Sequence, residues 1–212
     1  MGLSQRFRNC KLFSIIPAVY SASGLAPQLL ETARLHLRPY EPADAVAFFA
    51  VLDQSRERLR SSFPDRLRAV PTLADAPAQL AAFAHDWRTG RFYVFGIWHR
   101  VSQAYLGDIC LMPQRGDQAE IGYYLASEAE GQGYAREALG AIMAFGFEQV
   151  RAGRLLIRCF ADNVRAQQVA QAHGFQLQGQ EPAPLALPWH RFNFWSSQSK
   201  MPVILHFVRA RQ

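Results

Sequence analysis

The 212-residue chain predicts a single layered domain of the α/β or α+β class, in which strands and helices alternate along the sequence. Three observations predict this class. Apolar runs separated by tight polar turns follow one another between residues 92 and 125, which is typical of an antiparallel meander. The glycine-rich segment Glu130–Gly133 then joins a strand pattern to a helical pattern. Farther along, a strand pattern at Arg154–Phe160 is followed by a helical pattern that ends at Gly174, a residue type common at helix C-termini.

The first half of the domain contains one strand pattern and two helix patterns. Polar and apolar residues alternate at its start, which suits a half-buried strand. Pro42 suits the first turn of a helix, and Thr72 is placed to cap the next one. The segment between these helices is polar and contains Phe63-Pro64-Asp65, so we expect a loop there. In order, the expected elements are a strand (Arg34–Arg38), a helix (Glu41–Leu52), a loop (Arg56–Arg68) and a helix (Leu73–Arg88).

The second half combines the meander with two strand–helix pairs. The turn Gln114–Asp117 separates two strands of the meander, and from Tyr134 the apolar residues fall on one face of a helix. In order, we expect strands at Phe92–His99, Ala104–Met112 and Gln118–Leu125, a helix at Tyr134–Gln149, a strand at Arg154–Phe160, a helix at Asn163–His173, a strand at Phe175–Gly179, a loop rich in Pro and aromatics at Glu181–Met201, and a strand at Pro202–Arg209.

Composition narrows the class of protein. Half of the residues are hydrophobic and 19% are charged, which indicates a globular protein rather than a disordered one. The net charge of +6 and the pI near 9.6 suggest affinity for anions. The sequence contains no dense Lys/Arg run, so nucleic-acid binding is the less favoured explanation of that charge.

The three cysteines predict neither disulfide bonds nor a metal site. Cys10, Cys110 and Cys159 show neither a paired framework nor a metal-ligand spacing, so we expect reduced thiols, no metal site and a cytoplasmic protein.

Residues 1–28 are expected to form an N-terminal extension, ordered or disordered. Its apolar run is short and broken by Pro17, so we expect neither a signal peptide nor a membrane span. Residues 29–212 are expected to form the domain.

The segment Glu130-Gly131-Gln132-Gly133-Tyr134-Ala135 predicts an anion-binding turn. Two glycines one residue apart let the backbone turn tightly and direct several amide N–H groups at one point. A helix that begins at about Tyr134 adds N–H groups without a partner in the helix, and the positive end of the helix dipole. A pyrophosphate is the anion that we expect at such a turn.

Three segments of the chain, in this order, resemble the GNAT superfamily of acyl-CoA-dependent N-acyltransferases, and more narrowly its RimJ/RimL-like branch. They are Glu120–Leu125 (E-I-G-Y-Y-L), Glu130–Ala138 with the glycine-rich turn, and Asn163–Phe175, a helix that ends in Gly-Phe. The opening segment Leu30–Ala45 also resembles that branch. The resemblance implies a GNAT-like fold, with a mixed, mostly antiparallel central sheet of about six to seven strands flanked by about four helices.

The resemblance also implies acetyl-CoA as the co-substrate. The pantetheine arm would lie alongside the strand that ends at Leu125, and main-chain amides of the glycine-rich turn would hold the pyrophosphate. Asn163 would hydrogen-bond the arm from the far side, and the same residue is also placed as a plain helix cap. The implied acetyl-CoA-binding residues are Tyr123, Tyr124, Leu125, Gly131, Gln132, Gly133, Tyr134, Ala135, Arg136 and Asn163.

Glu120 is the candidate general base. An attacking amine must lose a proton, since a protein α-amine has a pKa of about 8 and a lysine a pKa of about 10.4. The resembling branch carries a glutamate at this place in its strand, which would take the proton directly or through an ordered water. Without the resemblance, Glu120 would be interpreted as an exposed strand residue that pairs with a neighbouring arginine.

Two positions depart from the branch. Glu130 stands where Arg or Gln is usual, and its carboxylate would repel a pyrophosphate unless it points to solvent or Arg136 offsets its charge. We therefore expect somewhat weaker cofactor binding. Ala166 stands where a hydroxyl usually faces the departing sulfur. Tyr123 and Tyr124 are conceivable replacements for that hydroxyl, and the sequence does not choose between them.

The sequence thus predicts an enzyme that moves an acetyl group from acetyl-CoA to a primary amine by direct attack, since no activated nucleophile is visible. Branch resemblance favours the N-terminal α-amine of a protein, with ribosomal proteins as the type substrate, and also allows small-molecule amines. The loops Phe63–Asp65 and Trp189–Trp195 would frame the acceptor. A non-catalytic acyl-CoA-sensing module is the alternative, and a nucleic-acid-associated protein is a third. We expect a monomer or a homodimer.

Overall fold

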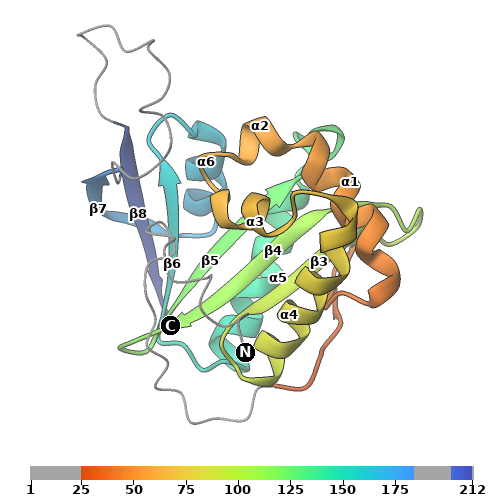
Figure 1. Cartoon of the computed structure of the whole chain (residues 1–212). Coiled ribbons are helices and arrows are strands. Elements are labelled where there is room, and N and C mark those ends of the chain that lie inside the picture. The colour runs from red at the N-terminus through yellow and green to blue at the C-terminus, as the bar shows by residue number, and fades with distance from the viewer. Residues whose placement is uncertain (1–24, 184–201, 212) are drawn as a thin grey trace, which may run out of the picture.

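The computed structural model describes residues 25–183 and 202–211, which build one sheet with helices on both faces (Figure 1). Its eight strands lie in the order β1-β2-β3-β4-β5-β6-β8-β7, and every neighbouring pair is antiparallel except β5 and β6. The mixed, mostly antiparallel sheet expected from the sequence is confirmed, with slightly more strands than expected. The strands are β1 (Leu30–Glu31), β2 (Leu35–Arg38), β3 (Tyr93–His99), β4 (Tyr105–Gln114), β5 (Gln118–Leu125), β6 (Arg154–Phe160), β7 (Gln176–Pro182) and β8 (Val203–Ala210).

Helices α1 to α4 lie over one face of the sheet, α5 packs behind it, and α6 lies beside β6 (Figure 1). None of the helices in the described ranges is long and apolar enough to cross a membrane. The α-helices are α1 (Ala45–Gln54), α2 (Arg56–Leu59), α3 (Pro64–Ala69), α4 (Ala76–Arg88), α5 (Tyr134–Glu148) and α6 (Val164–Ala172), and the 3-10 turns are η1 (Pro42–Asp44), η2 (Leu73–Asp75) and η3 (Ser127–Ala129).

The loop expected at residues 56–68 is wrong, because this segment folds into α2 and α3. Pro64 supplies the first residue of α3, a position that suits proline. Leu59, Phe63 and Arg66 are buried, and their spacing places them on one side of the two short helices, facing the sheet. The polar composition concealed this pattern because one of the three inward-facing residues is an arginine.

Helix α5 lies very close to the sheet at Gly146. A Cβ atom at this glycine would lie 2.7 Å from Leu111 Cδ1 on β4 and 3.0 Å from Leu155 Cδ2 on β6, so no larger residue fits without displacement. This close packing fixes the helix against the strands. It therefore also fixes the glycine-rich turn that leads from β5 into the N-terminus of α5.

Strands β5 and β6 pair over only half of their length. Residues Gln118–Ile121 of β5 pair with Arg154–Ile157 of β6, after which β5 continues beside β4 as far as Leu125 and β6 continues beside β8 as far as Phe160. The two strands diverge toward their C-terminal ends (Figure 1). The resulting gap lies between the turn that starts α5 and the N-terminus of α6, and it positions the candidate site.

Candidate active site

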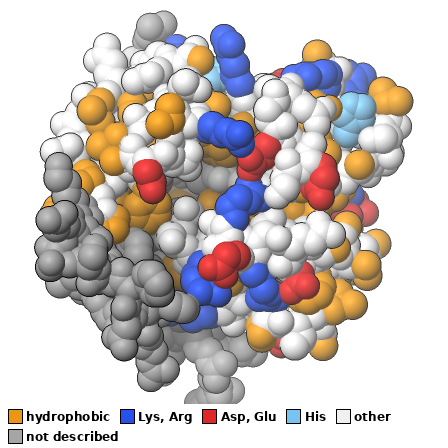
Figure 2. All heavy atoms as spheres, turned by 90° about the horizontal axis from the view of Figure 1, so that it is seen from above, with side chains coloured by type: hydrophobic (Ala, Val, Ile, Leu, Met, Phe, Trp, Pro, Cys, Tyr) orange, Lys and Arg blue, Asp and Glu red, His pale blue; other side chains and the backbone are white. Residues whose placement is uncertain are grey.

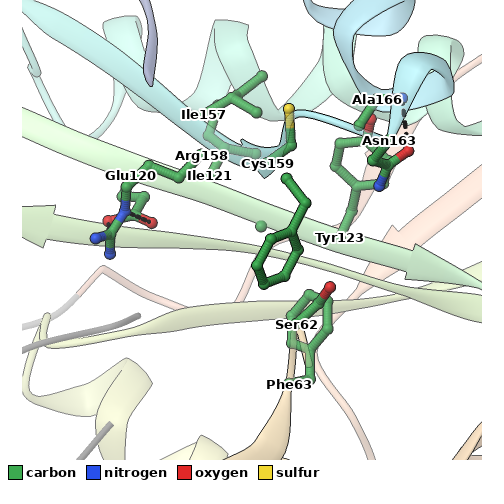
Figure 3. A pocket seen from close by; sticks show the side chains of 12 residues that line it. Ser62, Phe63, Glu120, Ile121, Tyr123, Ile157, Arg158, Cys159, Asn163 and Ala166 are labelled. Atoms are coloured by element: carbon green, nitrogen blue, oxygen red, sulfur yellow. Dashed lines mark hydrogen bonds and ion pairs between the residues drawn. The ribbon is translucent and has the colours of Figure 1, made fainter. Parts of the chain in front are cut away.

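A pocket of about 90 Å³ lies where β5 and β6 diverge (Figure 3). Residues from both strands line it, together with the link between α2 and α3 and the first turn of α6. The lining residues are Ser62, Phe63, Glu120, Ile121, Gly122, Tyr123, Ile157, Arg158, Cys159, Phe160, Asn163 and Ala166. Two of the three segments that carry the family resemblance, Glu120–Leu125 and Asn163–Phe175, therefore contribute residues to one pocket, although they are far apart along the chain.

The backbone edge of β5 is open to this gap at Tyr123 and Leu125. The N–H of Ala126 donates to Leu106 O at the end of β4 (2.7 Å), and backbone groups of successive strand residues point to alternate sides. Tyr124 therefore directs its backbone groups to β4, whereas Tyr123 and Leu125 direct theirs to the gap. Of the three residues predicted to pair with an extended arm, these two are suitably oriented and Tyr124 is not. Arg58 Nη2 already donates to Leu125 O at 2.6 Å.

The glycine-rich turn has the geometry of an anion site. Gly131 and Gly133 have φ values of +75° and +80°, which a residue with a side chain adopts only at a cost in free energy. The first bond of α5 runs from Glu137 N–H to Gly133 O (3.1 Å), so the N–H groups of Tyr134, Ala135 and Arg136 precede the helical ladder. No atom lies within 4 Å of a Cβ placed on Gly131, which leaves room for a phosphate.

Arg34 and Glu137 hold this turn in place through a contact that no local sequence pattern predicts. Arg34 Nη1 donates to Gln132 O (2.9 Å), Arg34 Nε donates to Glu137 Oε2 (2.7 Å), and the guanidinium lies 4.7 Å from the centre of the Tyr134 ring. Burial alone would raise the pKa of Glu137, but hydrogen bonds from Thr32 and Arg34 outweigh it and lower that pKa. The turn is therefore anchored to the strand that opens the domain.

The Glu130 carboxylate contacts two arginines. It accepts from Arg58 of α2, and its Oε2 accepts from Arg165 Nη1 of α6 at 2.5 Å. The sequence suggested Arg136 as a residue that could offset this charge, and the structure adds these two arginines from other helices. Seen from above, basic and acidic side chains stand next to one another on this side of the molecule (Figure 2). The group formed by Glu130 and its two partners is net positive, so it does not repel a pyrophosphate as an isolated carboxylate would.

Glu120 is buried, with 4% of its surface exposed, and lies at one end of the pocket. Its carboxylate accepts two hydrogen bonds from Arg158 (2.8 and 2.9 Å) and one from Gln114 (2.6 Å), as Figure 3 shows for the arginine. Burial raises the pKa of Glu120 above its ordinary value, while Arg158 and Gln114 act to lower it. The alternative of an exposed strand residue is wrong, although the pairing with an arginine is confirmed.

Asn163 and Ala166 form the opposite side of the pocket, in the first turn of α6. Asn163 Oδ1 accepts the Ala166 N–H at 3.1 Å, so the helix-cap role is confirmed. This bond uses only the amide oxygen, which leaves the Asn163 NH₂ group as a donor toward the pocket (Figure 3). The cap and a contact with a bound arm are therefore compatible.

Comparison with known proteins identifies this arrangement. The family model of the acetyltransferase (GNAT) domain matches residues 34–176 of the chain. The chain belongs to the GNAT acetyltransferase family. The match spans every site element described above, from Arg34 beside the turn to α6.

Individual relatives agree with the RimJ/RimL-like branch. The chain is 28% identical to the N-acetyltransferase YoaA of Bacillus subtilis over 153 residues, which cover 71% of this chain and 84% of YoaA. It is 39% identical to the ribosomal-protein-serine acetyltransferase of Escherichia coli over 61 residues, 29% of this chain and 34% of that protein. The structure of RimL, a ribosomal L7/L12 α-N-protein acetyltransferase in complex with coenzyme A, superposes with a TM-score of 0.72 at 18% identity, covering 86% of this chain and 98% of RimL.

This GNAT chain is therefore an acyl-CoA-dependent N-acetyltransferase, and acetyl-CoA is its co-substrate. The site fits that co-substrate: the glycine turn offers clustered N–H groups and space, and the gap beside β5 offers an unpaired strand edge. Whether each predicted residue contacts acetyl-CoA stays a prediction.

The thiols near the site are not poised as nucleophiles. Burial, with a contribution from Asp162, raises the pKa of Cys159 to about 11, and burial raises the pKa of Cys110 to about 12 although Arg66 opposes it. Both are free and buried. Cys10 and the predicted acceptor loop Trp189–Trp195 lie outside the described residues, as does most of the N-terminal extension.

Proposed function

We propose that this N-acetyltransferase acetylates the N-terminal α-amine of a protein, with a small-molecule amine as the second candidate acceptor. The observation that carries the proposal is the pocket where β5 and β6 diverge, which has the buried Glu120 carboxylate at one end and Asn163 at the other. Relatives named as ribosomal-protein acetyltransferases support a protein acceptor. An amine that enters between α3 and the sheet would meet Glu120 and the open edge of β5 together.

Different parts of the site would bind different parts of acetyl-CoA. The N–H groups of Gly131 to Arg136 would bind the pyrophosphate, and the β5 edge at Tyr123 and Leu125 would orient the arm by backbone hydrogen bonds. Backbone N–H groups held in place on a strand can also stabilise the negative charge that develops on a carbonyl oxygen during attack. Orientation of this kind lowers the barrier because the reacting groups are already aligned.

Glu120 would act as the general base. Its carboxylate is the one buried acidic group among the described residues that line the pocket, and Arg158 fixes its orientation through two parallel hydrogen bonds. Since these donors already occupy the carboxylate, we infer that it receives the proton of the amine through a water molecule. Arg158 would then be a positioning residue, which the sequence offered only as an unspecified neighbouring arginine.

Attack by the amine requires no covalent enzyme intermediate. The thiols of Cys159 and Cys110 keep their protons near neutral pH because of their raised pKa values, so neither supplies a nucleophile. The acetyl group would pass to the acceptor nitrogen in one displacement.

A panel of acceptors tests this proposal. Thiol release from acetyl-CoA should be fastest with peptides that carry a free N-terminus, and should disappear when the same peptides are N-terminally blocked but retain an internal lysine. Polyamines and aminoglycosides serve as the small-amine arm. Release with the blocked peptides or only with small amines would refute the α-amine assignment.

The alternative that the sequence left open, a non-catalytic acyl-CoA sensor, is supported only by the alanine at position 166. It predicts acetyl-CoA binding without thiol release for any acceptor in the same panel.

A further inference from the structure

The edge of β5 that an extended arm would use is already occupied at one position. Leu125 directs its backbone groups to the gap, because its neighbours in the strand direct theirs to β4. Its carbonyl oxygen accepts a hydrogen bond from Arg58 Nη2 of α2 at 2.6 Å. A charged donor at this distance forms a strong bond. An arm that pairs along β5 as far as Leu125 must therefore first displace Arg58.

Arg58 is held in this position by two further partners. Its Nη2 also donates to the hydroxyl of Ser55, the residue before α2, at 3.0 Å, and its Nη1 donates to the Glu130 carboxylate. A guanidinium offers several N–H donors in fixed directions, so one side chain can hold all three partners at once. An isolated ion pair at a surface contributes little to stability, but these three bonds share the cost of ordering a single arginine.

Glu130 extends this set of contacts across the gap. Its Oε2 accepts from Arg165 Nη1, in the first turn of α6, at 2.5 Å. Leu125 lies on the β5 side of the gap and Arg165 on the α6 side, where the two strands have diverged (Figure 1). We call the three side chains Arg58, Glu130 and Arg165 the strap. Their exposed fractions are 38%, 30% and 78%, so the strap lies at the surface and can open without disturbing the core.

We propose that the strap closes the β5 edge in the free protein and opens when acetyl-CoA displaces Arg58 from Leu125. This inference rests on the proposed course of the pantetheine arm along β5. It gives the unusual carboxylate at position 130 a role, since this carboxylate is what ties Arg58 to Arg165. When only a fraction of the molecules is open, the apparent affinity for a ligand falls by that fraction.

Simple attraction between the arginines and the phosphates is the competing explanation of this cluster. It predicts that association depends on the charge near the turn and not on the hydrogen bonds of Arg58. Arg58→Lys separates the two explanations, because lysine keeps the charge but lacks the planar fork that holds Ser55, Leu125 and Glu130 together. The strap therefore predicts faster association of acetyl-CoA in Arg58→Lys, whereas attraction alone predicts no change.

The test is the association rate constant of acetyl-CoA, measured by stopped-flow fluorescence on the free protein. Arg58→Lys and Glu130→Gln should each raise this rate constant about 3- to 10-fold and lower the Kd for acetyl-CoA. The difference from wild type should shrink at about 0.5 M salt, because salt weakens the exposed contacts of the strap in the wild-type protein. Circular dichroism of each variant confirms that it is folded.

Two matched controls make the test specific. Arg60→Lys, in an exposed arginine that ends α2 and pairs with Glu57, should leave the rate constant unchanged. Glu128→Gln removes the same charge as Glu130→Gln from an exposed residue outside the strap, and should change the rate constant by no more than about twofold.

Association in Arg58→Lys that is unchanged or slower than in wild type would overturn the inference. Equal acceleration in Glu128→Gln and Glu130→Gln would also overturn it, because charge alone would then explain the effect. The readout is acetyl-CoA binding, so it does not depend on an acceptor. Faster association in Arg58→Lys, combined with no thiol release for any amine, would support the strap and refute the proposed transfer.

Discussion

Replacing Arg66 by methionine should destabilise the protein strongly, because this arginine is the buried partner of a buried carboxylate. Asp108 on β4 has a side chain that is 0% exposed, and the Arg66 side chain on α3 is 6% exposed. The Asp108 carboxylate accepts from Arg66 and also from the hydroxyl of Tyr40 (3.1 Å). Arg66→Met would leave that carboxylate in the core without a counter-charge.

The expected loss of unfolding free energy is about 3–5 kcal/mol, the usual cost of removing one partner of a buried ion pair. For a domain of this size that corresponds to a fall in melting temperature of roughly 6–20 °C. Urea titration followed by circular dichroism measures the free energy directly. Since α3 follows the Ser62–Phe63 wall of the pocket, we also expect a raised KM for the acceptor amine in the variant.

Arg68 offers a matched control on the same helix. Its side chain is 65% exposed and pairs with Asp65 on the surface, so Arg68→Met should change the unfolding free energy by no more than about 0.5 kcal/mol. Equal costs for the two variants, or a cost below about 1 kcal/mol for Arg66→Met, would refute the reasoning from burial.

The pH dependence gives an independent check on Arg66→Met. Burial already raises the pKa of Asp108, and Arg66 and Tyr40 act to lower it. Without Arg66 the pKa of Asp108 should rise further, so the folded state binds a proton that the unfolded state, with a pKa of about 3.9, has lost. The stability deficit of the variant should therefore be smaller near pH 5 than near pH 8. A deficit that grows on acidification would contradict this account.

Three further predictions concern the site. Gly133→Val should abolish acetyl-CoA binding, measured by calorimetry, whereas Gly116→Val, at a positive φ in a distant turn, should cost similar stability and leave binding intact. Glu120→Gln should lower kcat at least about tenfold with acetyl-CoA affinity retained, and wild-type rates from about pH 6 to about pH 9 would rule out the base role. Glu130→Gln should tighten acetyl-CoA binding severalfold at low salt, because its two arginine partners stay near the phosphate turn; weaker binding would mean that the carboxylate is needed to position them.

Local sequence signals predicted most of the fold. The meander from β3 to β5, the start of α5 at Tyr134 and the Asn163 cap of α6 all depend on residues that are close together in the chain. Thr72 likewise begins the expected second helix, where its hydroxyl donates to Asp75 at 2.6 Å. The prediction of a loop at residues 56–68 was wrong because the sequence does not show which arginines are buried. Only tertiary contacts distinguish the buried Arg66 from the exposed arginines around it.

The sequence predicted individual residues of the candidate site, but not the ion pairs that those residues form. The glycine turn, Glu120 and Asn163 could be found from motif resemblance. The two arginines that hold Glu130 come from α2 and α6, and the arginine that holds Glu120 comes from the parallel strand β6. Such contacts follow from strand register and helix placement, which no local pattern specifies.

The most direct test of the central claim is a calorimetric titration of acetyl-CoA into the wild-type protein, followed by thiol release on the same sample with a free N-terminal peptide. The account predicts stoichiometric binding, thiol release that depends on the peptide, and a peptide heavier by one acetyl group at its α-nitrogen. Absence of acetyl-CoA binding would contradict the assignment of the phosphate turn and of the β5–β6 gap. Binding without thiol release for any amine would contradict the catalytic role and leave the sensing module.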